Sequence, residues 1–303
     1  MKHQILGAGA IGHLVAGMLS RANISNEFVL RSNTKNSQHT YYTFTDKTES
    51  IQLVRNAISI DELPAIEVLW VCVKAYQLRD VLTSIKPKCS SNSIILLLQN
   101  GMGNLELGNE VLGDVLSKNG LFVVSNTHGA FLEQDQENLV IEHTGVGQMK
   151  LGGNYLGSTV EKPDFIDSLP DAMNLIWRED IESELWLKLG INAVINPLTA
   201  IHQCRNGDLA LNEGYKDILD KLIGELKLLY NAINKPDLAN AISEQCYQVI
   251  ENTADNYSSM LRDVQCGRKT ELDAITGYLL NAASEAKLVL VEHQKLYERL
   301  LNT

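Results

Sequence analysis

The sequence predicts an α/β fold in which an N-terminal doubly wound parallel sheet is followed by an all-helical C-terminal domain. In the first half, short apolar runs alternate with amphipathic stretches, which is the pattern of β–α units. From about residue 181 the strand-like runs stop, and long helical periodicity replaces them. The length of 303 residues agrees with this division, since at roughly 150 residues per domain it is enough for two.

The elements of the first half can be assigned in chain order. Residues 4–6 and 27–30 are expected to be strands on either side of a helix over residues 11–21. Residues 68–73 and 94–98 are apolar without interruption, so these strands should be covered by helices on both faces, as in a parallel sheet. The remaining expectations for this half are strands at residues 120–124, 139–143 and 148–151 and a hairpin loop over the acidic residues 133–137.

The second half is expected to contain helices alone. Examples of long helical periodicity are residues 215–232 and 270–286. We place the domain boundary near residues 177–180, where the pattern changes. This boundary gives two domains, residues 1–179 and residues 180–303.

Composition excludes several classes of protein. Hydrophobic residues make up 45% of the chain and charged residues 21%, which is typical of a globular protein and not of a disordered one. No apolar run reaches the ~18 residues of a membrane span. The 26 Lys and Arg residues against 37 Asp and Glu residues give a net charge of −11. Nucleic-acid binding is therefore excluded as a main function, because phosphate contacts need a concentrated basic surface.

Cysteine usage and the N-terminus favour a reducing, cytoplasmic location. The five cysteines are odd in number and form no Cys-x-x-Cys pair, so buried and unpaired thiols are expected. Residues 1–4 lead straight into an apolar strand, without the long apolar region and cleavage site of a secretory signal. The seven histidines show no metal-ligand spacing, so no metal site is predicted.

A glycine-rich loop joins the first strand to the first helix. The loop comprises Gly7, Ala8, Gly9, Ala10, Ile11 and Gly12. In such a Gly-x-Gly-x-x-Gly pattern the first glycine permits a tight turn, the second lets the backbone approach a pyrophosphate, and the third allows close helix–strand packing. The helix N-terminus adds unpaired N–H groups and the positive end of the helix dipole. The context predicts a Rossmann-type domain that binds a dinucleotide, with a purely structural turn as the alternative.

The end of the second strand predicts which dinucleotide binds. NAD sites usually carry Asp or Glu here, about 20 residues past the glycines, to bond the ribose 2′-hydroxyl. This chain has Arg31 instead, with Ser32 and Lys35 close by. A guanidinium attracts a 2′-phosphate, which a carboxylate would repel. Arg31 therefore favours NADP(H) over NAD(H), and the alternative is an ordinary surface arginine.

Three polar side chains share one face of a predicted helix in the second half. Lys188, Asn192 and Asn196 stand at positions i, i+4 and i+8. A cation with two amides suits a small molecule that carries hydroxyl, ketone and carboxylate groups, and the alternative is a solvated polar stripe. Pro197 follows directly and predicts a kink or an interruption of the helix.

Four further segments resemble those of the ketopantoate reductase family. They are residues 73–77, 98–103, 184–200 and 256–261, the last followed by residues 268–271. The most specific parts are Lys-x3-Asn-x3-Asn-Pro-Leu-Thr-Ala and Ser-Ser-Met-Leu followed by Thr-Glu, and the resemblance covers essentially the whole chain. It implies an N-terminal domain that binds NADPH and a helical domain that closes over the substrate. The implied reaction is reduction of 2-dehydropantoate to (R)-pantoate, a step toward pantothenate and coenzyme A.

The resemblance also implies roles for individual residues. Lys188 would be the general acid, since an ammonium stabilises and protonates the oxygen that gains charge when a ketone is reduced. Glu271 would bond the nicotinamide ribose and help to organise the site. Lys74, Asn100 and Ala130 would lie on the cofactor side, with Asn100 also next to the substrate. The residues implied to bind substrate oxygens are Asn192, Asn196, Asn206, Asn256 and Ser259, the last two at its carboxylate end.

Two other functions remain open. One is a family reductase for another branched 2-oxo acid, because a polar pocket does not fix the alkyl group. The other is a non-catalytic NADPH-binding sensor, which would not need Lys188 as a proton donor. His128 and His143 are interpreted as structural, because Lys188 takes the acid role. The expected partner is a small 2-oxo acid, with no nucleic acid and no membrane, and a homodimer is one of the oligomeric states left open.

Overall fold

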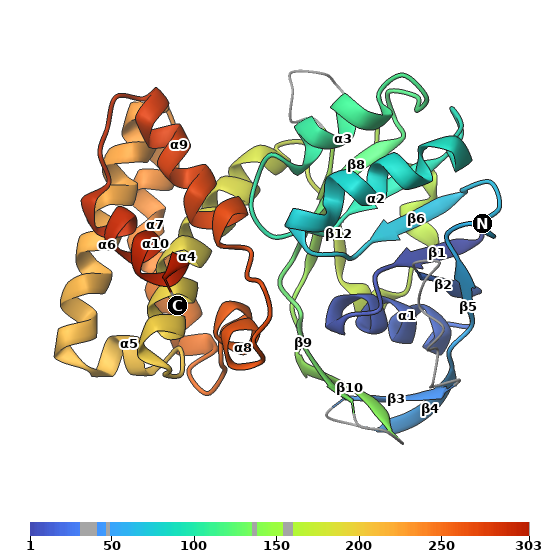
Figure 1. Cartoon of the computed structure of the whole chain (residues 1–303), viewed down its shortest axis with the longest axis horizontal. Coiled ribbons are helices and arrows are strands. Elements are labelled where there is room, and N and C mark those ends of the chain that lie inside the picture. Colours follow the sequence, from blue (N-terminus) through green and yellow to red (C-terminus); the bar gives the residue numbers. More distant parts are fainter. Residues whose placement is uncertain (31–40, 47–48, 135–137, 154–159, 303) are drawn as a thin grey trace. The chain divides into compact units, whose positions relative to one another are not determined.

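The computed structural model describes residues 1–30, 41–46, 49–134, 138–153 and 160–302 (Figure 1). The chain forms two compact units. The first consists of Met1–Gln99 and Asn104–Glu182, and the second of Asn100–Gly103 and Ser183–Thr303. The domain boundary between residues 179 and 180 stays a prediction, and the short segment Asn100–Gly103 groups with the helical unit although it follows a strand of the first.

The first unit is built on an eight-stranded sheet in the order β12-β11-β8-β7-β6-β1-β2-β5. Its strands are β1 (His3–Leu6), β2 (Asn26–Leu30), β5 (Ala57–Ser59), β6 (Val68–Val71), β7 (Ile94–Leu97), β8 (Leu121–Asn126), β11 (Met149–Gly152) and β12 (Leu175–Trp177). From β8 to β5 every pair is parallel, while β11 runs antiparallel to β8. This parallel part has the strand order of dinucleotide-binding folds, which reverses between β1 and β6. The predicted doubly wound parallel sheet is confirmed.

Helices cover both faces of this sheet (Figure 1). Helix α1 (Ala10–Arg21) lies on one face, and α2 (Leu78–Ile85) and α3 (Asn104–Leu112) lie on the other. The strands β1 and β6 are buried along their whole length because they are covered on both sides. Leu14 and Met18 of α1 pack with strand residues such as Trp70 in the core.

A second sheet, of four strands, was not predicted as a sheet, although the sequence analysis expected one of its strands at residues 139–143. Its order is β4-β3-β10-β9, and it covers the side of α1 that faces away from the large sheet (Figure 1). Its strands are β3 (Tyr41–Thr45), β4 (Ser50–Val54), β9 (Gly129–Gln134) and β10 (Leu139–Gly145). Strands β9 and β10 pair antiparallel. Of the expected hairpin loop over residues 133–137, Glu133 and Gln134 belong to strand β9, and residues 135–137 lie outside the described residues.

The described part of the second unit consists of helices and turns. Its α-helices are α4 (Ile181–His202), α5 (Asp208–Leu211), α6 (Glu213–Ala232), α7 (Pro236–Asn252), α8 (Ser259–Gln265), α9 (Tyr278–Glu285) and α10 (Val291–Leu301). Helices α6 and α7 pack along each other. The buried hydroxyl of Tyr230 on α6 donates to the backbone oxygen of Trp186 on α4, at 2.7 Å. The predicted helical character of this half is confirmed.

Three local expectations need correction. Helix α4 continues through Pro197, so of the two alternatives expected there, a kink or an interruption, the interruption does not occur. Residues 193–200 are all buried, and their packing offsets the hydrogen bond that proline cannot donate. The helix expected over residues 270–286 contains a π-helical turn, η6 (Asp273–Gly277), before α9. The expected burial of the thiols is wrong for Cys266, which is exposed, although Cys246 is buried.

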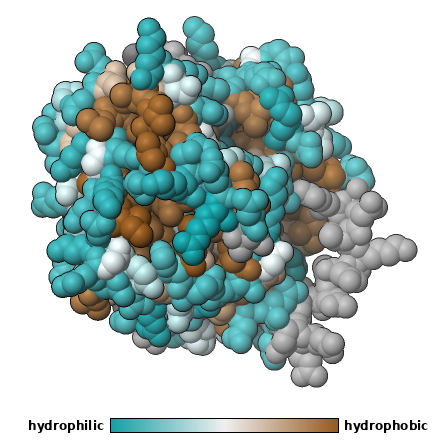
Figure 2. Space-filling model, turned by 60° about the vertical axis from the view of Figure 1, so that its left-hand side comes forward, coloured by the Kyte–Doolittle hydropathy of each residue, from teal (hydrophilic) through white to brown (hydrophobic). Residues whose placement is uncertain are grey.

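The surface mixes hydrophilic and apolar side chains. Figure 2 shows apolar patches set among hydrophilic residues. The exposed large apolar side chains of the helical unit include Leu211, Leu228, Val289, Val291 and Leu301. Across the described ranges, no helix is both long enough and apolar enough to cross a membrane.

Candidate active site

The glycine loop lies at the carboxyl end of β1, against the end of β6. Gly7 has a φ of +114°, and a Cβ added there would lie 2.8 Å from the carbonyl carbon of Cys72. A Cβ added to Gly12 would lie 1.9 Å from the Gly7 oxygen, so both positions require glycine. At Gly9, by contrast, an added Cβ would meet nothing within 4 Å in the described part of the chain. The loop is therefore open at the position where a dinucleotide-binding loop approaches the pyrophosphate.

His13 holds the glycine loop from the first turn of α1. Its backbone N–H and its ring Nδ1 both lie 3.0 Å from the Gly9 oxygen. A carbonyl oxygen only accepts hydrogen bonds, so Nδ1 carries the ring proton. Burial lowers the pKa of His13 to about 4, which keeps the ring neutral at pH 7. The sequence analysis missed this residue, although its place directly after the glycine pattern was a usable signal.

Two further residues predicted on the cofactor side, Lys74 and Ala130, lie on different strands or loops of the first unit. Lys74 follows β6, and its backbone N–H donates to Oε1 of Gln77 at 3.2 Å. Since β1 and β6 are parallel neighbours, Lys74 and the glycine loop lie at the same edge of the sheet, where the strand order reverses. Ala130 is half-buried in β9. Arg31 lies outside the described residues.

In the second unit, α4 carries Lys188, Asn192 and Asn196 on successive turns. Asn196 is buried, and Lys188 and Asn192 are half-buried. Burial lowers the pKa of Lys188 to about 8, while the negative charge of Glu271 acts in the opposite direction. An ammonium with this pKa is still mostly protonated at pH 7 and gives up its proton more readily than an ordinary lysine. Such a group suits proton donation near neutrality.

Glu271 links this lysine to the segment that follows β7. Its buried carboxylate accepts a hydrogen bond from Nδ2 of Asn100 at 3.0 Å. The Met102 N–H donates to the Ala274 oxygen at 3.3 Å, which holds the same segment against η6. The structure thus brings Asn100 and Glu271 together, and π-helical turns such as η6 are frequent at functional sites.

Asn206 and Asn256, which were also predicted to bind substrate, lie next to each other. The Asn206 backbone N–H donates to the Asn256 oxygen at 3.0 Å, and its side-chain Nδ2 donates to Oγ1 of Thr253 at 2.9 Å. The buried Oδ1 of Asn206 has no hydrogen-bond partner among the described residues. Buried acceptors are nearly always bonded, so this oxygen is a place where a ligand hydroxyl could donate.

Ser259 is the exposed first residue of α8, and its neighbour Ser258 has a structural role. The buried Oγ of Ser258 accepts from the Leu261 N–H at 3.1 Å and from Oγ1 of Thr199 at 2.7 Å. Ser258 therefore caps α8 and connects it to α4 through Thr199, which lies three residues after Asn196. The sequence analysis missed Ser258 and Thr199, although a serine just before an apolar helical run is a common start signal.

Comparison with known proteins shows the family to which the chain belongs. A family model described as "Ketopantoate reductase PanE/ApbA" matches residues 4–154, and its counterpart "Ketopantoate reductase PanE/ApbA C terminal" matches residues 180–302. The 2-dehydropantoate 2-reductase of Vibrio cholerae is 33% identical over 299 residues, which cover 98% of this chain and 95% of that one. The chain belongs to the ketopantoate reductase family. It is an oxidoreductase, as its motifs predicted.

Solved structures of other proteins have the same fold as this member of the ketopantoate reductase family. The probable 2-dehydropantoate 2-reductase of Bacillus subtilis is 29% identical, covers 100% of this chain and 99% of its own, and gives a TM-score of 0.78. A D-mandelate dehydrogenase in a ternary structure with NADH and anilino(oxo)acetate is 19% identical, covers 98% and 96%, and gives a TM-score of 0.82. At that identity the second likeness concerns the fold alone.

Two histidines of the first unit, His128 and His143, form a buried pair. Nε2 of His128 donates to the Met173 oxygen at 2.9 Å, so Nδ1 of His128 is an acceptor. That Nδ1 lies 3.0 Å from Nε2 of His143 and accepts the Gly147 N–H at 3.2 Å. These bonds tie β10 to its neighbouring loops, which agrees with a structural interpretation of both histidines.

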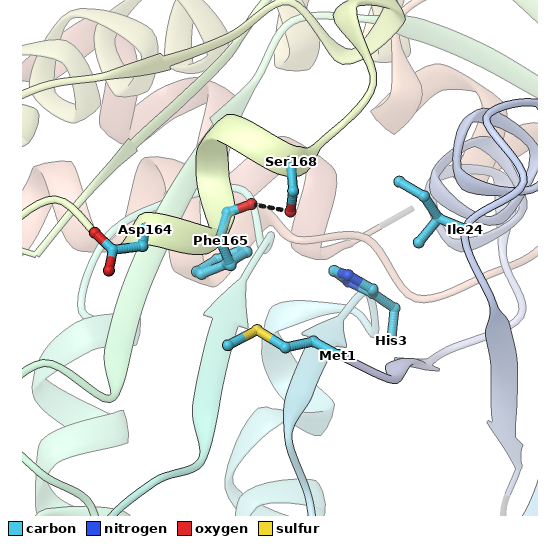
Figure 3. Close-up of a pocket in the computed structure, with 6 residues that line it drawn as sticks. All are labelled: Met1, His3, Ile24, Asp164, Phe165 and Ser168. Atoms are coloured by element: carbon cyan, nitrogen blue, oxygen red, sulfur yellow. Dashed lines mark hydrogen bonds between the residues drawn. The ribbon is translucent and has the colours of Figure 1, made fainter.

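A cavity of about 390 Å³ lies at the opposite edge of the sheet (Figure 3). It is lined by Met1, His3, Ile24, Asp164, Phe165 and Ser168. His3 begins β1, whereas the glycine loop follows the other end of that strand, so the cavity is separate from the glycine loop. Nδ1 of His3 accepts a hydrogen bond from Nε1 of Trp70 at 3.1 Å, which is a packing role.

Within the described ranges, no group of three or more His, Cys, Asp or Glu residues could hold a metal ion.

Proposed function

We propose that the chain is a cytoplasmic, NADPH-dependent 2-dehydropantoate 2-reductase that forms (R)-pantoate on the way to pantothenate and coenzyme A. The observation that carries this proposal is Lys188, a lysine of lowered pKa beside the buried Glu271, in a chain of the ketopantoate reductase family. A reductase of 2-oxo acids needs such a proton donor, and a protein that only binds a dinucleotide does not.

The glycine loop and Lys74 would hold the dinucleotide, and Arg31 would select the form with a 2′-phosphate. The open space at Gly9 and the N-terminus of α1 fit the phosphates. The preference for NADPH rests on Arg31 in the sequence. When bound, the reduced nicotinamide supplies the hydride that the ketone carbon receives.

Residues of the helical unit would bind the substrate and protonate it. Asn192, Asn196 and Asn206 would bond its oxygens, with Asn256 and Ser259 at the carboxylate end. The Lys188 ammonium would lie at the ketone oxygen, stabilise the negative charge that grows there and donate a proton from Nζ. Glu271 would keep Lys188 protonated through its negative charge, and the hydrogen bond from Asn100 fixes the orientation of that carboxylate.

A second candidate is reduction of a 2-oxo acid with an aromatic side chain. The fold likeness to D-mandelate dehydrogenase favours its inclusion in the test. The loss of NADPH absorbance should be followed with 2-dehydropantoate, smaller aliphatic 2-oxo acids and phenylglyoxylate, and repeated with NADH. We expect the highest kcat/KM with 2-dehydropantoate and NADPH. A higher kcat/KM with phenylglyoxylate would favour the second candidate, and no turnover of any 2-oxo acid would contradict both.

A further inference from the structure

Two arginines gather around Tyr257 in the helical unit. Cζ of Arg262 lies 4.3 Å from the centre of the Tyr257 ring, and Cζ of Arg205 lies 5.3 Å from it. A guanidinium at this distance is attracted by the negative face of an aromatic ring. The tyrosine therefore holds two guanidinium groups near one another, of which that of Arg205 is also paired with the carboxylate of Asp255.

This arginine–tyrosine cluster, Arg205, Tyr257 and Arg262, adjoins the residues proposed to bind the substrate carboxylate. Tyr257 directly follows Asn256, and Arg205 directly precedes Asn206. Arg262 stands three residues after Ser259 on α8, so both lie on the same side of that helix.

Arg262 is held in place by a chain of polar contacts. Its Nη1 donates to Oε1 of Gln265 at 3.3 Å, and Nε2 of Gln265 donates to Oε1 of Gln203 at 3.5 Å. Nε2 of Gln203 then donates to the Ala200 oxygen on the last turns of α4, at 2.6 Å. The chain of contacts links the guanidinium to the helix that carries Lys188, which limits the number of orientations that the half-buried arginine can adopt.

The proposed substrate carries a negative charge that the other binding residues do not neutralise. Asn192, Asn196, Asn206, Asn256 and Ser259 are all uncharged. Lys188 is a cation, but its ammonium is assigned to the ketone oxygen. A planar guanidinium can bind a carboxylate through two parallel hydrogen bonds, which combines charge with orientation.

We infer that Arg262 binds the carboxylate of the substrate together with Ser259, and thereby makes the enzyme select 2-oxo acids over uncharged ketones. The inference rests on the proposed function, because it assumes a 2-oxo acid in the site. Arg205 belongs to the same cluster but is exposed, and its Nη1 already lies 3.3 Å from both the backbone oxygen and Oδ1 of Asp255. It therefore serves as a matched control.

The experiment compares a 2-oxo acid with its uncharged methyl ester in the wild type, Arg262→Gln and Arg205→Gln. The acid is the best substrate of the wild type, and NADPH is saturating. Both variants lose one positive charge near Tyr257, so a general electrostatic effect would appear in both. We expect Arg262→Gln to raise KM for the acid roughly ten- to hundred-fold, as for loss of a charge-assisted pair. KM for the ester should change less than about threefold, and Arg205→Gln should leave the acid-to-ester ratio of kcat/KM near the wild-type value.

Each other outcome has a distinct meaning. If the wild type reduces the acid and Arg262→Gln keeps the wild-type acid-to-ester ratio, the inference is wrong and the proposed function stands. An equal fall of the acid-to-ester ratio in both variants would indicate a general electrostatic attraction and no specific binding by Arg262. That result would also overturn the inference. Absence of activity toward every 2-oxo acid in the wild type would contradict the proposed function itself. If Arg262→Gln lowers the melting temperature, Arg262→Lys keeps the charge without the planar fork, and its KM for the acid should lie between those of the wild type and Arg262→Gln.

Discussion

Lys188 carries the proton in the proposed mechanism, and its pKa of about 8 limits the pH range in which it can act. The protonated form is the active one for ketone reduction, so kcat/KM should be constant below about pH 8. Above that value it should fall about tenfold per pH unit as the ammonium is lost.

Lys188→Ala should lower kcat by roughly 10²–10⁴-fold with little change in the dissociation constant of NADPH. A variant with near-normal kcat would mean that the proton comes from another group.

A substitution of Glu271 tests whether its negative charge acts on the pKa of Lys188. The carboxylate raises the pKa of Lys188, and Glu271→Gln removes that charge while its Oε1 can still accept from Asn100. The pH at which kcat/KM begins to fall should therefore move to lower values in this variant. A pH profile with an unchanged alkaline limb would show that Glu271 acts on the cofactor or the fold and not on the lysine.

Arg31 tests the choice of cofactor. Arg31→Ala should raise the dissociation constant of NADPH about ten- to hundred-fold, because a charge-assisted contact contributes roughly 1.5–3 kcal/mol. The dissociation constant of NADH should change little, since NADH lacks the 2′-phosphate. Fluorescence titration of both cofactors measures the two constants, and equal weakening would assign Arg31 a structural role.

At the scale of elements, substitutions at two glycines of the glycine loop should affect different properties, one the binding of NADPH and the other the stability of the fold. Gly9 has an extended backbone (φ −89°, ψ −171°) and open space at its Cβ position, so Gly9→Ala should keep the melting temperature of the wild type. The same methyl group should weaken NADPH binding at least tenfold, because it occupies the pyrophosphate's approach. Gly12→Ala should instead destabilise the protein by roughly 1–3 kcal/mol, since its Cβ overlaps the Gly7 oxygen. Calorimetry with cofactor titration tests both, and a destabilised Gly9→Ala would contradict the assignment.

The sequence predicted those elements whose burial requires a recognisable local pattern of apolar residues. Strands β6 and β7 are covered on both faces, so their apolar runs are unbroken. Strand β4 alternates exposed and half-buried residues, so it has no continuous apolar run. Strand β3 pairs with β10, which is distant in sequence. The small sheet is therefore defined by tertiary pairing and not by local composition. In the site, the spacing on α4 predicted a shared face. The bonds between Ser258 and Thr199 and between Asn100 and Glu271 join residues far apart in sequence, which no spacing rule reveals.

At the scale of the whole molecule, buried histidines make the first unit sensitive to acid. Burial lowers the pKa of His3 and of His13 to about 4, below the ~6.5 of an unfolded chain. Between these values the unfolded chain binds protons that the folded chain does not, so the free energy of unfolding should fall as the pH decreases from about 6.5 to about 4. Each histidine contributes at most about 1.4 kcal/mol per pH unit.

Urea unfolding at several pH values between 7 and 4.5 measures this loss of stability. His13→Gln offers the matched variant, because an amide N–H can still donate to the Gly9 oxygen but does not titrate in this range. Its free energy of unfolding should depend less steeply on pH than that of the wild type. Identical slopes would assign the acid sensitivity to other groups.

The hydrogen bond between Asn100 and Glu271 also has a consequence for synthesis of the chain on the ribosome. Its two partners are 171 positions apart, and the carboxylate is translated long after the glycine loop and Lys188, just before η6 and the helices that follow. A nascent chain that stops before Glu271 already contains the glycine loop and the lysine, yet it lacks the group that favours the charged form of that lysine. Premature termination should therefore release polypeptides that carry the phosphate-binding loop but have no reductase activity, and even a late nonsense mutation should behave as a complete loss of the enzyme.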